Sequence, residues 1–270
     1  MPEGDTVHKL ANFLAPRLEG QRLVSFEMGD ATAARRCQGQ RVRRVFAHGK
    51  HLYFELDNAL LVRSHLGMYG DWHRYRPGET WRKPAWRASI TLATEEAIYV
   101  CFNAKEVELV PASSVRRRIL ETRLGPDLLG EDIDFDRVVE RARGMLTSDA
   151  PLIDVLLDQR VAAGIGNVYK SEILFIEHYP PLAPQGGVGD DALRRMFALA
   201  AELLGKNLGG GPRVTRFERD AAGRQWVYGR RGLPCLRCEA RIESARLGRD
   251  HRSTYWCPSC QRTSQQAEGR

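Results

Sequence analysis

The sequence predicts an α+β protein with a β-rich first part, a helical second part and a small metal-binding finger near its end. Short strand-like segments gather before about residue 115, and segments with helical periodicity follow them. Two Cys-x-x-Cys pairs then stand in the last quarter of the chain. The chain has 270 residues, 43% of them hydrophobic, so it can bury a core without disulfides. Several short strands at this spacing favour a β-sandwich or a β-barrel.

The first expected element is a helix over residues 6–15. Val7, Leu10 and Leu14 would share one face of it, and Pro16 would mark its end. Five strands should follow, each short, apolar and bounded by turn residues: 39–46, 51–56, 60–64, 88–94 and 97–102.

The helical part should contain four helices, over residues 135–143, 151–160, 168–177 and 191–204. Gly164 and Gly166 lie between the second and the third, where glycine lets the backbone turn sharply. A helix that begins near Asn167 would point free backbone N–H groups outward, an arrangement that binds phosphate. A tight helix–helix connection without a ligand explains the same residues, and this segment alone does not decide between the two.

Four cysteines have the spacing of zinc ligands: Cys235 and Cys238, then 18 residues, then Cys257 and Cys260. Four thiolates leave no open coordination position, so one bound Zn²⁺ would be structural and would stiffen the β-hairpin between the pairs. Two disulfides are the alternative. The N-terminus has no signal-peptide pattern, which predicts a reducing cytoplasm and disfavours disulfides.

Two further cysteines, Cys37 and Cys101, stand alone in the sequence and should be small buried apolar residues.

The net charge is +7, and residues 205–270 hold 14 basic and 6 acidic side chains. This concentration predicts a polyanionic partner, most often nucleic acid, although a solvated basic tail is the alternative. No apolar run reaches the roughly 18 residues of a membrane span, so no membrane partner is expected.

The N-terminus can act as a chemical group. Removal of Met1 would leave a secondary amine on Pro2, and such amines condense with aldehydic carbons to form a cationic iminium. An α-amino group titrates near about 7.7–8.0, and the adjoining helix N-terminus should lower that value. Glu3 stands beside it as a proton donor or acceptor. Many proteins begin with the same residues and have no such activity.

Taken together, these features resemble the formamidopyrimidine-DNA glycosylase and endonuclease VIII family of base-excision repair enzymes. The residues that carry the resemblance span the chain: Pro2-Glu3-Gly4, Gly49-Lys50, residues 64–68, Gly125-Pro126-Asp127, residues 158–172, residues 227–230 and the four cysteines of the finger.

The resemblance implies three domains. Residues 1–114 would form a catalytic β-sandwich with flanking helices, residues 115–225 a helical domain with a helix–two-turns–helix element, and residues 226–270 a zinc finger. It also implies a monomer that binds double-stranded DNA with a damaged base or an abasic site, in the cytoplasm of a bacterium and associated with the nucleoid.

The implied activity is that of a bifunctional DNA glycosylase and AP lyase. The resemblance implies that the Pro2 amine attacks C1′ of a flipped nucleotide and forms a Schiff base with it, while Glu3 moves protons. It also implies that Lys50 assists β-elimination and Arg252 assists δ-elimination. The remaining matches are DNA-binding positions: His65 and Asn167 at phosphates, Met68 in the gap left by the flipped base, and Arg123 facing the orphaned base.

The sequence contains features of both lesion classes. Asp5 and Thr6 replace a proline and a carboxylate of many family members, and this start resembles the endonuclease VIII side, which acts on oxidised pyrimidines. The segment between residues 204 and 227 is also short for a loop that covers 8-oxoguanine. The run from His65 to Met68 instead resembles the side that acts on oxidised purines. We therefore expect oxidised pyrimidines, with oxidised purines as the alternative.

Two other readings share these motifs. One is a non-catalytic zinc-ribbon protein that binds DNA, and the other is an AP lyase with little glycosylase activity. The presence of Pro2, Glu3 and Lys50 together favours an enzyme over the non-catalytic protein.

Overall fold

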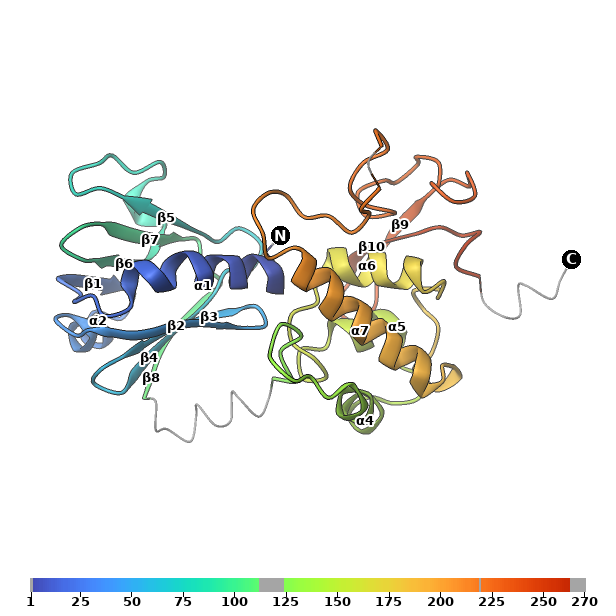
Figure 1. Ribbon diagram of the computed structural model, residues 1–270, viewed down its shortest axis with the longest axis horizontal. Coiled ribbons are helices and arrows are strands. Elements are labelled where there is room, and N and C mark those ends of the chain that lie inside the picture. Colours follow the sequence, from blue (N-terminus) through green and yellow to red (C-terminus); the bar gives the residue numbers. More distant parts are fainter. Residues whose placement is uncertain (1, 112–123, 219, 263–270) are drawn as a thin grey trace, which may run out of the picture. The chain divides into compact units, whose positions relative to one another are not determined.

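The structure, a computed structural model, describes residues 2–111, 124–218 and 220–262. The chain divides into two compact units, Met1–Thr122 and Arg123–Arg270 (Figure 1). Among the described residues, no helix is both long and apolar enough to cross a bilayer.

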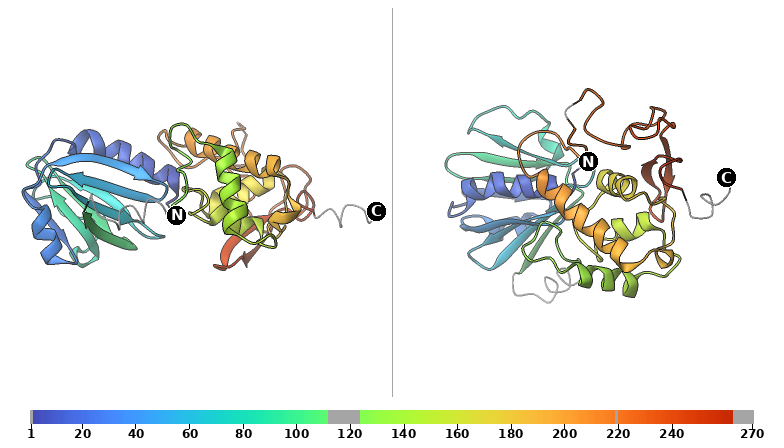
Figure 2. Two further views of the ribbon diagram at one scale, coloured as in Figure 1. Left: turned by 90° about the horizontal axis from the view of Figure 1, so that it is seen from below. Right: turned by 45° about the vertical axis from the view of Figure 1, so that its right-hand side comes forward.

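The first unit is a sandwich of two antiparallel four-stranded sheets, and the barrel alternative is wrong. One sheet has the order β1-β6-β7-β5 and the other β2-β3-β4-β8. Helix α1 (Gly4–Leu18) runs along the sandwich with one sheet on either side (Figures 1 and 2). The other elements are β1 (Ser25–Met28), α2 (Ala31–Cys37), β2 (Val42–His48), β3 (His51–Leu56), β4 (Leu60–His65), β5 (Asp71–Tyr75), the short 3-10 helix η1 (Ala85–Arg87), β6 (Ala88–Ala93), β7 (Ile98–Phe102) and β8 (Glu106–Pro111).

The core of this unit lies between the sheets and beneath α1. Its members include Val7, Leu14 and Leu18 of the helix, packed with apolar residues from both sheets. Cys37 and Cys101 are completely buried, as expected for small apolar residues, and burial raises the pKa of the Cys37 thiol to about 11.

The first helix is longer than expected. Glu3 is its N-cap residue, and Pro16 lies inside it instead of marking its end. A proline at this position removes the hydrogen bond to the carbonyl of Asn12, but both residues are exposed, so water can solvate that carbonyl. Burial of Leu18 holds the last turn in place.

Five strands were expected and all five form; 51–56 has the expected ends, and the other four are shifted by one to three residues at one or both ends. The three additional strands, β1, β5 and β8, each lie at the edge of a sheet. Edge strands have one hydrogen-bonding neighbour and tolerate polar residues, so β5 (Asp71–Tyr75) lacks the apolar pattern that predicts a strand.

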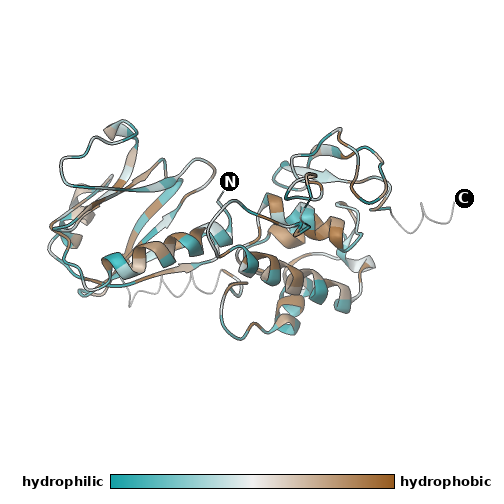
Figure 3. Ribbon diagram, turned by 45° about the horizontal axis from the view of Figure 1, so that its top comes forward, coloured by the Kyte–Doolittle hydropathy of each residue, from teal (hydrophilic) through white to brown (hydrophobic). Residues whose placement is uncertain are grey.

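The second unit contains the helices and the finger. Its helices are α4 (Phe135–Met145), α5 (Leu152–Leu157), α6 (Asn167–Ile176), the short 3-10 helix η2 (Gln185–Gly187) and α7 (Asp190–Lys206). Apolar side chains of α4, α5, α6 and α7 form one core, and Figure 3 shows brown, apolar stretches on these helices. Strands β9 (Glu243–Leu247) and β10 (Arg252–Trp256) pair as the expected hairpin.

The second helix of this unit ends earlier than expected, at Leu157. The Asp158 side chain accepts hydrogen bonds from the backbone N–H (3.0 Å) and the guanidinium (2.9 and 2.6 Å) of Arg160. An aspartate that bonds the backbone two residues on stabilises a turn instead of a further helical turn.

Candidate functional site

The N-terminal residues stand at the start of α1. Glu3 is completely buried, and its carbonyl accepts hydrogen bonds from Thr6 N at 3.0 Å and Val7 N at 3.2 Å. The first turn of the helix is therefore anchored on Glu3. Pro2 is half-buried and precedes the positively polarised end of the helix by two residues.

Lys50 lies in a two-residue turn between β2 and β3. His48 pairs with His51 across the turn, and Gly49 has a φ of 54°, a conformation that favours glycine. His51 in turn pairs with His65 on β4, and their rings are 4.8 Å apart. The fold thus brings Lys50 and His65 to the same end of one sheet, called the Lys50 edge below. Burial, and then the charges of Lys105 and Lys50, lower the pKa of His65.

Arg63 lies buried behind this edge. Its Nη1 donates to His51 Nδ1 at 2.8 Å, and its Nη2 forms ion pairs with Glu106 at 3.0 Å and Glu108 at 3.3 Å. Burial and nearby positive charges lower the pKa of His51 to about 3 and that of His65 to about 4. Both rings are therefore neutral at neutral pH, and Lys50 brings a positive charge to this edge.

The loop after β4 presents two large side chains to solvent. Met68 is 50% exposed and Tyr69 is 75% exposed. Glycine is required on both sides of them, because a Cβ on Gly67 would lie 2.7 Å from Lys105 Cβ and one on Gly70 would lie 2.4 Å from the Leu66 carbonyl. The sequence analysis assigned Met68 and not Tyr69, although the enclosing glycines mark both residues.

The turns between α5 and α6 form a compact connection. The Gln159 amide donates to the carbonyls of Leu157 (2.8 Å) and Ile165 (3.1 Å) and accepts from Gly164 N at 3.1 Å. Asn167 is the first residue of α6, as expected, and is 5% exposed. A well-ordered connection therefore places Asn167 at a helix N-terminus, the arrangement that suits phosphate.

The motif Gly125-Pro126-Asp127 packs against these turns. Gly125 N donates to the Gln159 carbonyl at 2.7 Å, and Ala163 N donates to the Pro126 carbonyl at 2.8 Å. A Cβ on Gly125 would lie 2.3 Å from the Val161 carbonyl oxygen, so this close approach requires glycine.

The four finger cysteines converge. Their Sγ atoms all lie within 4.8 Å of one another, and Sγ pairs stand at 3.3, 3.4 and 3.9 Å. Disulfide sulfurs would be about 2.05 Å apart, whereas Zn–S bonds of about 2.3 Å in a tetrahedron separate sulfurs by about 3.8 Å. The N–H groups of Arg237 and Cys260 also point at cysteine sulfurs. These residues fit one structural zinc ion, and the disulfide alternative is wrong.

The tip of the finger is fixed to α5. Arg249 N donates to both carboxylate oxygens of Asp154, at 3.1 and 3.0 Å. A Cβ on Gly248 would lie 2.4 Å from Asp154 Oδ1, so the turn packs tightly on the helix. Arg252 begins β10 and is exposed, and its side chain has no hydrogen bond or ion pair within the described part of the chain. It is thus available to an anion.

Sequence reasoning missed Glu172, which is completely buried in α6. Its carboxylate accepts from the backbone N–H groups of Trp226 (2.8 Å), Val227 (2.9 Å) and Tyr228 (2.8 Å), and from the Thr215 hydroxyl. Burial raises the pKa of Glu172, and the four hydrogen bonds act in the opposite direction. Glu172 therefore ties the segment that leads into the finger to α6.

The predicted residues fall in both units. The first unit holds Pro2, Glu3, Lys50, His65 and Met68, of which Lys50 and His65 are brought to one sheet edge. The second unit holds Asn167, Arg252 and the zinc ligands Cys235, Cys238, Cys257 and Cys260. Arg123 and the predicted boundary at residue 114 lie outside the described residues.

Three family models match the chain. They describe the formamidopyrimidine-DNA glycosylase N-terminal domain (residues 1–105), its H2TH domain (residues 124–218) and a zinc finger found in these glycosylases and in isoleucyl-tRNA synthetase (residues 232–263). Solved structures of the Lactococcus lactis glycosylase share the fold. One with abasic-site DNA has a TM-score of 0.82 at 23% identity, and one with oxidised-pyrimidine DNA has 0.82 at 24%. Both cover 97% of this chain and 100% of theirs.

Curated relatives are similar over nearly the whole length. Endonuclease 8 2 of Mycobacterium bovis is 38% identical over 269 residues, which cover 97% of this chain and 100% of the relative. A DNA-(apurinic or apyrimidinic site) lyase of Mycolicibacterium smegmatis is 36% identical over 265 residues, covering 98% and 100%. The chain therefore belongs to the formamidopyrimidine-DNA glycosylase and endonuclease VIII family of DNA-repair enzymes.

Proposed function

We propose that the protein is a bifunctional DNA glycosylase and AP lyase that acts on double-stranded DNA with a damaged base or an abasic site. The observation that carries the proposal is the placement of Pro2 and the buried Glu3 at the start of α1, in the same unit as the Lys50 turn. Membership of the family supports the same reaction.

The proposed chemistry begins with removal of Met1, which leaves the Pro2 amine free. Pro2 N attacks C1′ of a flipped nucleotide, the glycosidic bond breaks, and the base leaves with a proton. The sugar ring opens, with Glu3 moving protons to and from it, and an iminium joins C1′ to Pro2.

The iminium then acts as the electron sink for strand cleavage. It acidifies the C2′ proton, whose loss expels the 3′ phosphate (β-elimination), and a second elimination expels the 5′ phosphate (δ-elimination). Hydrolysis of the iminium releases the sugar fragment and restores the amine. Lys50 and Arg252 would stabilise the two departing phosphates, because their charges oppose the charge that develops there.

The remaining residues would hold the DNA. We assign His65 and Asn167 to phosphates, Met68 with Tyr69 to the gap left by the flipped base, and Arg123 to the orphaned base. The zinc ion would stiffen the hairpin that carries Arg252 and take no part in the reaction.

We favour oxidised pyrimidines as substrates. The curated relatives described above include one named endonuclease 8, and residues 207–226 form a short segment before the finger. Against this, the Lactococcus lactis glycosylase has been solved both with Fapy-dG DNA and with an oxidised pyrimidine, so relatives of this fold bind both classes.

Three further assignments complete the proposal. The bacterial origin of the relatives, together with a chromosomal substrate, favours the cytoplasm of a bacterium and association with the nucleoid. One chain carries all the proposed functional residues, which favours a monomer. The domain division at residues 114 and 225 stays a prediction.

The proposal is tested by incision of duplexes that each carry one lesion. We expect cleavage with phosphate at both ends of a one-nucleotide gap, with faster turnover of oxidised pyrimidines than of 8-oxoguanine. Binding of these duplexes without cleavage would favour the non-catalytic protein. Cleavage of abasic DNA alone would favour an AP lyase without glycosylase activity.

A further inference from the structure

We propose that Trp86 and Arg87 form an additional DNA contact, with Arg87 on a backbone phosphate and the Trp86 ring against the adjoining deoxyribose. This inference rests on the proposed function, because it takes the DNA duplex as the partner. It concerns a part of the first unit for which the reaction assigns no role.

Trp86 is the most exposed large hydrophobic residue among those described, at 78% of its surface. It lies in η1, and the guanidinium carbon of Arg87 stands 4.8 Å from the centre of its ring. The indole ring of Trp86 and the guanidinium of Arg87 thus form a cation–π pair, and the exposed guanidinium can still donate hydrogen bonds to a ligand.

The segment that leads to Trp86 is firmly held. Trp81 packs on Tyr75, with ring centres 6.0 Å apart, and meets the edge of Phe102 at 5.9 Å. Lys83 Nζ binds both carboxylate oxygens of Asp71, at 2.6 and 2.7 Å. Trp81 is thus packed inward while Trp86 is held outward, so the exposure of Trp86 is not that of a loose loop.

The pair lies at the end of the β1-β6-β7-β5 sheet where β5 begins after the Met68–Tyr69 loop. Ala88, directly after η1, pairs with Phe102, which pairs with Asp71 at the start of β5. Two strand spacings, about 10 Å, therefore separate η1 from the strand that follows the Met68–Tyr69 loop.

Main-chain hydrogen bonds connect this pair to the Lys50 edge. The Arg87 carbonyl accepts from Asn103 N at 2.9 Å, and two residues later Lys105 N donates to the His65 carbonyl at 2.9 Å. A duplex held at His65 would therefore pass within reach of Arg87.

Charge favours DNA over an apolar partner. Residues 74–87 hold five basic side chains and one acidic one, whereas residues 1–204 as a whole have a net charge of −1. Asp71 neutralises Lys83, but Arg74, Arg76, Arg82 and Arg87 are exposed. A single aromatic ring among cations suits a phosphate–sugar backbone better than a protein surface that needs a broad apolar patch.

The test is equilibrium binding of a labelled duplex with a stable abasic-site analogue over a series of salt concentrations. We expect Arg87→Gln to reduce the slope of log affinity against log salt by about 0.9, the value for one lost phosphate contact. Arg87→Lys should restore the slope, because the charge returns. Trp86→Ala should weaken binding several-fold, and Trp86→Phe should retain most of the affinity.

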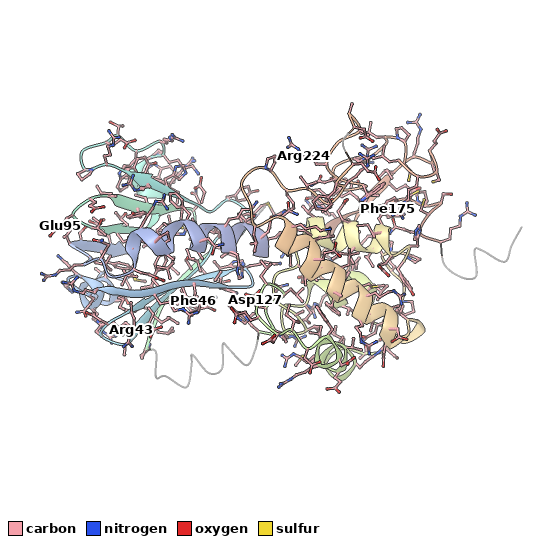
Figure 4. The ribbon with its side chains drawn as sticks, viewed as in Figure 1. Arg43, Phe46, Glu95, Asp127, Phe175 and Arg224 are labelled. Atoms are coloured by element: carbon pink, nitrogen blue, oxygen red, sulfur yellow. The ribbon has the colours of Figure 1, made fainter. Side chains whose placement is uncertain are left out.

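Arg43→Gln is the matched control. Arg43 lies on β2, labelled in Figure 4, with a 71% exposed side chain, and it is five residues from His48 at the Lys50 turn. The Arg43→Gln substitution removes one positive charge from the same unit, and its slope of log affinity against log salt should equal that of the wild type.

Two failures are distinguishable. If the wild type neither binds the duplex nor incises abasic DNA, the proposed function fails. If the wild type does both, while the Arg87→Gln and Trp86→Ala variants keep its affinity and salt slope, only this inference is overturned. It is also overturned if Arg43→Gln reduces the salt slope as much as Arg87→Gln does. Arg43→Gln should also incise abasic DNA at the wild-type rate, because Arg43 is not among the proposed DNA contacts.

Discussion

The guanidinium of Arg63 donates a hydrogen bond from Nη1 to Nδ1 of His51, at 2.8 Å. An arginine has no acceptor, so His51 must accept at Nδ1 and carry its proton on Nε2. The same guanidinium binds Glu106 and Glu108 on β8, and it therefore ties β3, β4 and β8 together behind the Lys50 turn. A buried, fully charged group thus supports the edge at which the proposed phosphate contacts lie.

This arrangement predicts acid-sensitive stability. The folded pKa values of His51 and His65, about 3 and about 4, lie below the usual 6.5 of the unfolded chain. Well above pH 6.5 both rings are neutral in both states and contribute nothing to the pH dependence of stability. As the pH falls from 6.5 towards 4, the unfolded chain binds protons that the folded chain does not, so the free energy of unfolding should fall.

Urea unfolding at pH 7.0, 5.5 and 4.5 measures this loss. We expect His51→Gln, which removes one of the two groups, to lose less stability between pH 7.0 and 4.5 than the wild type. His251→Gln is the control, because His251 is an exposed histidine of the other unit. An equal loss in wild type and His51→Gln would contradict the assignment of the effect to the buried pair.

Lys50→Gln should slow strand cleavage at an abasic site by roughly 10- to 100-fold, since a hydrogen bond to a charged group contributes about 1.5–3 kcal/mol. Single-turnover incision under saturating protein isolates this step. The control is Lys206→Gln. Lys206 is an exposed lysine of α7 that pairs with Glu202, so this variant loses the same charge and should cleave the DNA at the wild-type rate. Equal rates for the two variants would remove Lys50 from the reaction.

Glu172→Gln should destabilise the second unit by about 1–3 kcal/mol, because the new amide NH₂ would face backbone N–H donors and leave buried groups unpaired. Hydrogen exchange of the amides of Trp226, Val227 and Tyr228 gives the local readout, and exchange there should become faster. Glu202→Gln, at an exposed position of α7, is the matched control. Unchanged protection of the three amides would show that Glu172 does not hold this segment.

Removal of zinc by a chelator should unfold the β9–β10 hairpin and spare the first unit. The four thiolates converge from two turns, and without the ion they would repel one another or become protonated. The finger adds only a small apolar cluster around Phe175, labelled in Figure 4. Metal analysis should find one zinc per chain, and chelation should weaken DNA binding. A metal-free protein that kept the hairpin signals and its DNA affinity would contradict this role.

Much of the architecture could be predicted from local pattern. The zinc ligands were predictable because both the residue type and its spacing are in the sequence, and Cys235, Cys238, Cys257 and Cys260 do converge. The central strands were predictable because burial on both sides makes them apolar. The edge strands β1, β5 and β8 were not, since their pairing depends on distant residues.

Buried charged residues were the main feature of the fold that the sequence did not predict. Arg63 and Glu172 look like exposed residues of a strand and a helix, because a charged side chain normally faces water. Arg63 pairs with Glu106, 43 residues away along the chain, and Glu172 with the Trp226 amide, 54 residues away. No local pattern reports such partners. Tyr69 was not assigned for a different reason, because a turn has no hydrophobic periodicity against which an aromatic residue would stand out.

The central claim is that the amine of Pro2 forms the covalent intermediate. Borohydride reduction during reaction with abasic-site DNA should trap one DNA fragment per chain, and peptide mass analysis should place it on Pro2 N of protein that lacks Met1. The Lys50→Gln variant should still be trapped at Pro2, although its strand cleavage is slower. An adduct on a lysine, or none while the wild type still cleaves the DNA, would contradict the account.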